Sequence, residues 1–384
     1  MPDGPVRGGP IALHSPVTMN QQPNQQLGQA KDNEDWLKQD LQWVLPQITK
    51  LNVLDGETTI AGQAASFDDA INKAVELIDQ SQAPLIAGLS ELTIEAQRQA
   101  VGLAEKMRGR LIAHTEKAGS PCESSVIQSA TLGEFRQIDL LIRVQLTDDA
   151  SQLCDHLVEG LGDLAIVDLD GSLESVMALR QLLIGQSGQT EINAHSDTRL
   201  ALACHAIQQV QRVAVALGPK LDTRVESQWH KLAASIQQRQ RMAVLRFPPD
   251  RAANARGALE VVTWQTGLAP GNGIDFSSGA PRPMGSGLNF ASCDLLISAG
   301  GPCATEHDPL QDKNPNLKCI AIGPNIDTQA QVSFQTPGLV MGLAARVMRF
   351  DGIVLWLCPD PTSAPNDPAV QLLQDLTDRI ALPT

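Results

Sequence analysis

The chain has very few aromatic residues. Its 384 residues include seven Phe, five Trp and no Tyr, so aromatics make up 3% of the sequence. A large core must therefore be built from Leu, Ile, Val and Ala, which supply most of the 42% hydrophobic content. Aromatic side chains bury large areas and dominate the energetics of interfaces. Each tryptophan in such a chain therefore stands out.

Basic patches and long apolar runs are also lacking. The formal net charge is -14 and the isoelectric point is about 4.9, with the basic residues scattered along the chain. Nucleic acids and anionic membranes need basic patches, so neither is expected as a main partner. No apolar run approaches the ~18–20 residues that cross a membrane. The first 26 residues have no apolar signal-peptide core, and we expect a cytoplasmic protein.

Motifs for metal binding and nucleophilic catalysis are nearly absent. There is no CxxC, HxH or HExxH motif, and the odd number of seven widely spaced cysteines argues against a disulfide framework. The cysteines instead fit buried thiols in a reducing compartment. Only Cys122, in the segment HTEKAGSPCESS, is a candidate metal ligand or nucleophile. The neighbouring Glu123 would raise the pKa of its thiol, so an inert thiol is favoured.

Strands and helices alternate along most of the chain. In residues 83–113, a strand at Pro84–Ala87 precedes a helix at Thr93–Met107 and a second strand, RLIA. This β-α-β pattern predicts parallel sheets covered by helices. Further strands are expected at 138–145, 164–171, 212–219, 242–247, 293–301 and 317–325, and further helices at 66–81 and 225–239. The strands IDLLIRV and CDLLISA are similar in type, which gives the two halves of the chain a rough internal similarity.

The fold class predicted from this pattern is α/β, with two Rossmann-like lobes that have mostly parallel sheets. Several strands end in glycine-rich turns, but none spells GxGxxG or a P-loop, so ordinary turns are favoured over nucleotide sites. We expect a disordered tail at 1–32, an N-terminal helical docking segment at 33–64, a discontinuous first lobe at 65–115 and 195–360, a second lobe at 116–194 and a C-terminal segment at 361–384.

One stretch, VVTWQTGLAPGNGIDFSSGAPRPMG at 261–285, reads as a strand that breaks into a long loop. A long loop within a compact domain is usually functional or disordered, and this composition is not that of a solvated linker. Trp264 and Phe276 are expected to be buried anchors. They would either contact another protein or complete the core of this chain.

The same stretch carries a family resemblance. TWQTG followed by DFSSGAPRP resembles TWQTGYP…DFSRGYPRY in the B-type subunit of formylmethanofuran dehydrogenase, a member of the molybdopterin oxidoreductase superfamily. LSELTIEAQRQAVGLAEKMRGRLI, ATLGEFRQIDLLI and SLESVMALRQLL are similar to further segments of that family in the same order. The resemblance covers roughly residues 65–357. It implies a molybdopterin-oxidoreductase-like fold that lacks the iron–sulfur domain.

The departures from that family concern its redox centre. Residues 1–64 contain no cysteine for the family's iron–sulfur cluster. Cys122 stands in PCESS, where the family has Cys-His-Gly-Pro-Ser around its metal ligand. Asp148 and Asp149 replace part of the pterin cradle and would repel a phosphorylated cofactor. DRAANARGA, at 250–258, replaces a Gly-His-Tyr-Asn segment.

By resemblance, this pattern is most like the B-type subunit of the bacterial formyltransferase/hydrolase complex. That complex converts formyl-tetrahydromethanopterin to formate through a methanofuran analogue. The resemblance implies a non-catalytic structural subunit with no catalytic residue, no molybdopterin or tungstopterin and no iron–sulfur cluster. The implied partners are an amidohydrolase-type hydrolase subunit, a formyltransferase subunit and a small structural subunit.

Two alternatives stay open at this point. The first is a working tungsten or molybdenum subunit of formylmethanofuran dehydrogenase, with Cys122 as metal ligand and a pterin between the lobes. The second is a free-standing α/β protein that binds a small molecule.

Overall fold

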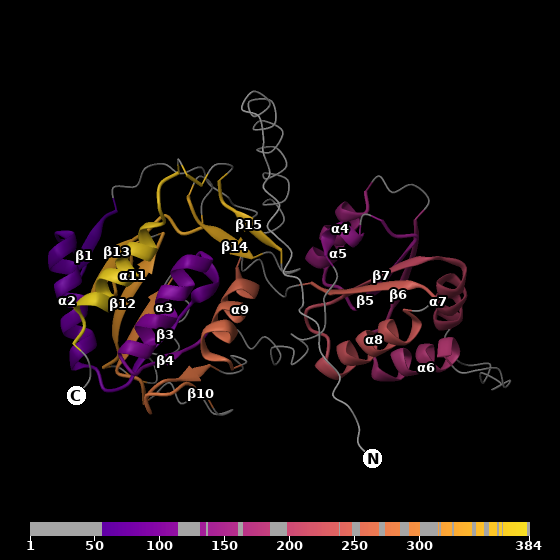
Figure 1. Cartoon of the computed structure of the whole chain (residues 1–384), viewed down its shortest axis with the longest axis horizontal. Helices are drawn as coiled ribbons and strands as arrows, with labels where there is room; N and C mark the ends of the chain where they lie inside the picture. The colour runs from indigo at the N-terminus through magenta and orange to yellow at the C-terminus, as the bar shows by residue number, and fades with distance from the viewer. Residues whose placement is uncertain are drawn as a thin grey trace, which may run out of the picture.

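The computed structural model contains two lobes, each built on its own sheet (Figure 1). It describes residues 56–113, 131–135, 137–159, 164–184, 198–237, 239–247, 254–268, 273–284, 292–299, 314, 316–324, 326–339, 343–348, 353–358, 361–362 and 364–381. The expected tail at 1–32, residues 33–55 of the expected docking segment, and Cys122 lie outside the described residues. The rest of that segment was expected to be helical but contains two short strands, Thr58–Ile60 and Gln63–Ala64, because these residues pair at the edge of the sheet of the first lobe.

The first lobe is organised around a nine-stranded sheet in the order β10-β9-β4-β3-β11-β12-β13-β1-β2. Its central strands β4, β3, β11, β12 and β13 run parallel, while β1, β2, β9 and β10 pair in antiparallel fashion at the two edges. The strands are β1 Thr58–Ile60, β2 Gln63–Ala64, β3 Pro84–Ala87, β4 Arg110–Leu111, β9 Ile274–Asp275, β10 Arg282–Pro283, β11 Leu295–Ala299, β12 Lys318–Gly323 and β13 Val332–Gln335.

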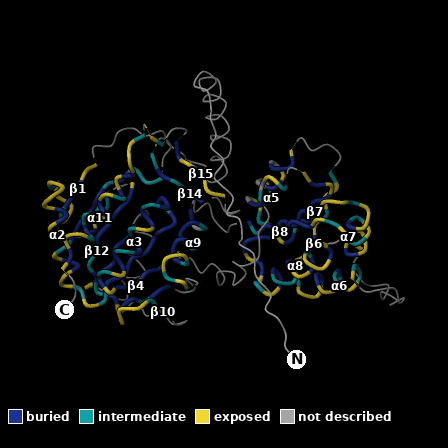
Figure 2. The backbone as a smooth tube through the Cα atoms, in the orientation of Figure 1, coloured by how far each residue is buried: buried dark blue, intermediate teal, exposed yellow. Residues whose placement is uncertain are grey.

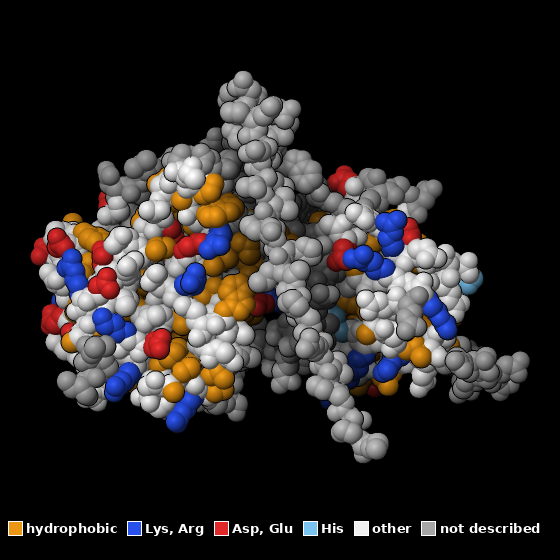
Figure 3. Space-filling view, viewed as in Figure 1, with side chains coloured by type: hydrophobic (Ala, Val, Ile, Leu, Met, Phe, Trp, Pro, Cys, Tyr) orange, Lys and Arg blue, Asp and Glu red, His pale blue; other side chains and the backbone are white. Residues whose placement is uncertain are grey.

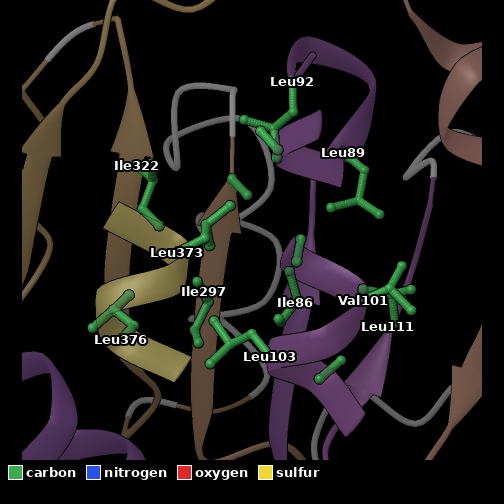
Figure 4. Close-up of a cluster of buried hydrophobic side chains, with 14 of the residues drawn as sticks. Ile86, Leu89, Leu92, Val101, Leu103, Leu111, Ile297, Ile322, Leu373 and Leu376 are labelled. Atoms are coloured by element: carbon green, nitrogen blue, oxygen red, sulfur yellow. The ribbon is translucent and has the colours of Figure 1, made fainter. Parts of the chain in front are cut away.

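Four helices cover one face of this sheet: α2 Phe67–Gln80, α3 Ile94–Lys106, α9 Ala255–Thr266 and α11 Pro368–Arg379. Three begin at capping side chains, as Ser66, Thr93 and Asp367 each accept a backbone hydrogen bond from the first turn. Aliphatic side chains from the strands and from α3 and α11 meet in the core (Figure 4). The expected helices at 66–81 and 93–107 and the strand at 84–87 are confirmed.

The second lobe has a four-stranded parallel sheet in the order β6-β5-β7-β8. Its core lies on both faces, and one cluster holds Trp229 of α8 while the other holds the edge-to-face pair of Phe135 and Phe247. Figure 2 shows the buried strands inside the exposed outer surfaces of the helices. The elements are α4 Leu132–Phe135, β5 Leu140–Val144, α5 Asp148–Leu157, β6 Ala165–Leu169, α6 Leu173–Ile184, α7 Thr198–Gln209, β7 Arg212–Leu217, α8 Thr223–Ile236 and β8 Arg241–Arg246.

The division of the chain differs from the one expected. The second lobe was expected to end at 194, but β7 pairs with β5 in the register Leu141↔Ala214, and β8 pairs with β7. The second lobe therefore extends through β8 and is inserted between β4 and α9. The C-terminal segment also differs, because α11 packs on α3 within the core of the first lobe. Strand order depends on long-range pairing, which the local pattern does not contain.

The stretch at 261–285 also begins differently. Residues 255–266 form the helix α9, not the start of a strand, and Gly267 ends it with a left-handed φ of 71°. The β-branched run favoured a strand, but Ala258, Val261 and Val262 recur at helical spacing and are buried in the first lobe. Tertiary packing of this apolar face outweighs the local β propensity.

A short hairpin, β14 Arg346–Met348 with β15 Val354–Trp356, lies beside α3 and α9. Within the described part of the chain, the helices are all too short or too polar to span a membrane.

Candidate functional site at the carboxyl ends of the strands

Open α/β sheets bind ligands beyond the carboxyl ends of their strands, where successive connections leave in opposite directions. Each lobe has one such switch point. In the first lobe β3 continues to β4 on one side, while its other neighbour β11 pairs onward with β12. In the second lobe β5 continues to β6, and β7 continues to β8. These two places are where a cofactor or substrate would be expected.

The switch point of the first lobe is closed by a backbone contact. Gly88 follows β3 with a left-handed φ of 85°, and a Cβ atom there would lie 2.7 Å from the carbonyl oxygen of Ala299, the last residue of β11. Cβ atoms essentially never approach a backbone oxygen so closely, and L-residues avoid this φ. Glycine lets the two strand ends touch.

The switch point of the second lobe is closed more tightly. The amide of Gly218, after β7, donates to the carbonyl of Val144 at 2.8 Å. A Cβ atom on Gly218 would lie 1.9 Å from the carbonyl oxygen of Gln145, and one on Gly171 would lie 2.0 Å from Oε1 of the same glutamine. Gln145 itself adopts a φ of 49°. The turns after β5, β6 and β7 therefore pack on one another around Gln145.

Two buried amide side chains hold the loop after β3. Gln97 Nε2 donates to the carbonyls of Leu89 at 2.9 Å and Leu92 at 3.1 Å. Asn254 Nδ2 donates to the carbonyl of Leu92 at 2.7 Å, while its Oδ1 accepts from the amide of Met348 at 2.7 Å. Asn254 thus ties the loop, α9 and the β14–β15 hairpin together.

The loop after β7 is held by a guanidinium group instead. Arg246 Nη2 donates to the carbonyls of Pro219 at 2.7 Å and Leu221 at 3.0 Å, and its Nη1 donates to Glu226 Oε2 at 2.6 Å. The Glu226 side chain is 5% exposed, so this ion pair is largely removed from water. A carboxylate on α8 therefore balances the charge that holds the loop.

The helix that starts at the second switch point carries its own negative charge. Asp148 is the first residue of α5, directly beyond the carboxyl end of β5, and Asp149 follows it. A helix N-terminus is a common anion site because its free amides and dipole attract negative charge. Asp148 adds a negative charge to the first turn of this helix, which disfavours a phosphate group there.

Two of the carboxyl groups described near the first switch point have raised pKa values. Burial raises the pKa of Glu91, in the 3-10 turn after Gly88. Burial also raises the pKa of Asp367, which accepts hydrogen bonds from Thr93 Oγ1 and the amide of Ala369. A carboxyl group with a raised pKa can serve as a general acid. Asp367 acts as a helix cap, and within the described residues Glu91 forms no hydrogen bond to another titratable side chain.

Three of the described cysteines are poor nucleophiles and poor metal ligands. Burial raises the pKa of Cys154 to about 12 and raises the pKa values of Cys204 and Cys293. Such thiols stay protonated at neutral pH, whereas metal binding and attack need the thiolate. Among the described residues, no group of three or more His, Cys, Asp or Glu side chains could hold a metal ion.

The two predicted anchors differ in burial. Phe276 is 2% exposed within the core of the first lobe, so its predicted burial is confirmed. Trp264, near the end of α9, is 60% exposed, so the prediction of its burial is wrong. Phe276 completes the core of this chain, whereas Trp264 does not.

Sequence reasoning found the glycine turns but missed the side chains that close the switch points. Gln97 lies within the EAQR segment and Asn254 within DRAANARGA, yet neither pattern shows that a buried amide holds a loop. Arg246 is the only charged residue within the strand MAVLRF. A charge at the carboxyl end of a buried strand is the signal that could have identified it.

Comparisons with known proteins identify a solved structure with the same fold. No family model and no curated sequence matches the chain. A chain in the crystal structure of the formyltransferase/hydrolase complex (FhcABCD) from Methylorubrum extorquens, solved in complex with methylofuran, matches with a TM-score of 0.63. The match is 18% identical in sequence and covers 84% of this chain and 98% of the other. At this identity the similarity establishes a shared fold.

Proposed function

We propose that this chain is a non-catalytic structural subunit, of the B type, in a formyltransferase/hydrolase complex. That complex would convert formyl-tetrahydromethanopterin to formate through a methanofuran analogue. One observation carries the proposal: the chain keeps both lobes of a fold seen in such a complex, while its own groups close both switch points. The closing groups are backbone carbonyls, which lie against the glycines, and buried side chains, which hold the loops that follow β3 and β7.

In this proposal the chemistry belongs to the partner chains. An amidohydrolase-type subunit would hydrolyse the formyl amide, a formyltransferase subunit would transfer the formyl group, and this chain with a small structural subunit would hold them in place. Neither an iron–sulfur cluster nor a tungsten or molybdenum pterin is proposed for this chain. The reasons are the lack of cysteine in residues 1–64, the aspartates at the start of α5 and the raised pKa values of Cys154, Cys204 and Cys293.

The test is formate production by the assembled complex. The chain would be tagged in its own cells, and the complex that purifies with it would be assayed with formyl-tetrahydromethanopterin. Under the proposal, a Cys122→Ser complex produces formate at the wild-type rate, because this chain contributes no reacting group. Loss of activity from an intact Cys122→Ser complex would contradict the proposal and favour the metal–pterin alternative.

A further inference from the structure

The fold brings three arginines together at the amino ends of two strands in the second lobe. Arg212 is the first residue of β7, Arg241 is the first residue of β8, and Arg239 lies in the turn between α8 and β8. All three line a cavity of about 690 Å³, which we call the arginine pocket. Figure 3 shows the opposite pattern on the first lobe, where Lys and Arg side chains lie apart from one another on the face toward the viewer.

Two of these arginines stand directly beside each other. Arg212 and Arg241 are register partners in the parallel pair of β7 and β8, so their side chains leave the same face of the sheet. Neighbouring strands lie about 4.8 Å apart, and like charges in directly opposite positions destabilise a sheet. Two guanidinium groups in these positions break a local rule of strand pairing, and such exceptions are expected at functional sites.

Neighbouring groups orient these two guanidinium groups without using all of their donors. Arg241 Nη2 donates to Glu134 Oε1 of α4, whose Oε2 accepts from the amide of Thr131 at 2.8 Å. Arg212 Nη1 donates to the carbonyl of Gln137 at 3.1 Å. A guanidinium group carries five N–H donors, so each of the two can still offer a pair of donors to a ligand. Side chains that are ordered beforehand lose less entropy on binding.

The ends of α7 and α8 also point to this edge of the sheet. Basic side chains near a helix C-terminus can simply offset the helix dipole. Other groups take that place here, because Gln240 Nε2 donates to the carbonyl of Val210, just after α7, at 2.8 Å. The amides of Arg239 and Gln240 donate to the carbonyl of Ile236, at the end of α8, at 2.8 Å and 3.0 Å. The guanidinium groups are therefore available for a ligand.

The charge of the pocket favours an anion. Against the three arginines stand two described carboxylates, Glu134 and Asp139. Asp139 Oδ2, beside the pocket, accepts from the amides of Gln211 and Arg212 at 3.2 Å and 2.9 Å. The described charged groups at this pocket therefore sum to a positive charge, although the whole chain carries a formal charge of -14. Paired arginines bind carboxylate and phosphate groups with two parallel hydrogen bonds.

The size and the remaining lining of the pocket define the ligand further. Small-molecule sites typically have volumes of about 300–1,000 Å³, and this cavity of about 690 Å³ lies within that range. The described residues that line it include no aromatic side chain on which a base could stack, whereas Ile138 and Ala243 supply aliphatic surface. A small aliphatic body with several anionic groups fits this lining.

We propose that the arginine pocket binds a small aliphatic molecule with two or more carboxylate or phosphate groups. Arg212 and Arg241 bind one anionic group, and Arg239 binds a second. The pocket lies at the amino ends of β7 and β8, whereas Gly218 closes the switch point at the carboxyl end of β7. The pocket is therefore separate from the closed switch point, and this inference does not depend on the proposed function.

The experiment measures the binding of citrate and of pyrophosphate to the full chain, purified with the subunits that accompany it. Isothermal titration calorimetry is done at low ionic strength, because salt screens exposed charges, and NaCl of matched ionic strength is the blank. Arg212→Ala and Arg239→Ala should each weaken binding by about 10-fold and the double variant by about 100-fold, since a hydrogen bond to a charged group contributes a factor of about 10 or more.

Arg224→Ala is the matched control. It removes the same charge from the second lobe, but Arg224 pairs with Asp222 at the opposite end of α8 from the pocket. This variant should bind both probes as wild type does. Within the described residues only the backbone amide of Arg239 forms a hydrogen bond, so Arg239→Ala should leave the fold unchanged. Equal melting temperatures without ligand would show that the variants fold.

The expected result is binding that the two pocket variants weaken and Arg224→Ala does not. Binding of citrate alone would identify a polycarboxylate as the ligand class, and binding of pyrophosphate alone would identify a phosphorylated molecule. Heats no larger than those of the NaCl blank for both probes would overturn the proposal. Unchanged binding by the double variant, or equal weakening by Arg224→Ala, would show that the anions bind elsewhere and would also overturn it. The proposed function is tested separately by formate production, so it stands or falls independently of this result.

Discussion

Both lobes close their switch points with a close contact between a glycine and a backbone carbonyl. The side chains that hold the following loop differ between the lobes. In each lobe a glycine after a central strand touches the carbonyl at the end of a neighbouring strand: Gly88 against Ala299, and Gly218 against Gln145. The following loop is then held by hydrogen bonds to its carbonyls. In the first lobe the donors are the neutral amides of Gln97 and Asn254, whereas in the second lobe the donor is Arg246.

This difference shows what each closure depends on. A buried amide needs its hydrogen bonds satisfied but no counter-ion, so the first closure rests on geometry alone. A buried guanidinium needs a carboxylate close by, so the second closure also depends on Glu226 of α8. The second lobe should therefore be more sensitive to the loss of one side chain, and the first lobe less.

The largest effect is expected from Arg246→Ala. The substitution leaves the buried Glu226 carboxylate without its guanidinium and frees the carbonyls of Pro219 and Leu221. Breaking a buried pair from one side typically costs about 3–5 kcal/mol of unfolding free energy. Denaturant unfolding followed by tryptophan fluorescence, to which the buried Trp229 of α8 contributes, would measure this. A cost below about 1 kcal/mol would contradict the assigned role.

Substitution of Gly218 and Gly88 tests the glycine–carbonyl contacts directly. Gly218→Ala should cost about 3 kcal/mol because its Cβ meets backbone atoms that cannot move aside, and Gly88→Ala should cost about 2 kcal/mol. Gly102→Ala is the control, since Gly102 lies inside α3 and its Cβ would meet nothing within 4 Å. That change should stabilise the first lobe by up to about 1 kcal/mol. Equal effects at all three positions would show that the contacts at the switch points are unimportant.

Asn254→Ala should cost about 2–3 kcal/mol, because it leaves the carbonyl of Leu92 and the amide of Met348 with one partner fewer in a buried site. Because Asn254 is neutral, this cost should be the same at low and high salt. Urea titrations at two salt concentrations would check both statements. A strong salt dependence would mean that the first closure also relies on charge.

The smallest effect is expected from the more exposed ion pair of the second lobe. Asp168→Asn should cost less than about 1 kcal/mol, because Arg143 and Asp168 are partly solvated. The hydrogen bond from Arg143 lowers the pKa of Asp168 below its usual value. The stabilisation is therefore present above the unfolded-state pKa of about 3.9 and is lost as the pH falls through the lower folded-state pKa. Unfolding measured from about pH 6 to about pH 2 should show wild type and variant converging in acid.

Local patterns were enough to predict most helices and strands but not their assembly. Ser66 and Thr93 were recognisable caps, and the apolar strands were short and well bounded by turns. The pairing of β7 with β5 joins strands far apart in the sequence, as the register Leu141↔Ala214 shows, so no local window contains it. Trp264 was expected inside because aromatic side chains bury large areas. Its position depends on which side of α9 faces the sheet, which became visible only once residues 255–266 were seen to form a helix.

The most direct test of the central claim is metal and pterin analysis of the complex that purifies with this chain. If the chain is a scaffold, the complex contains formyltransferase and hydrolase subunits, and neither tungsten, molybdenum nor an acid-released pterin is present in proportion to the chain. About one tungsten or molybdenum per chain together with a pterin would contradict this account. It would make this chain the catalytic subunit, and Cys122 the first residue to substitute.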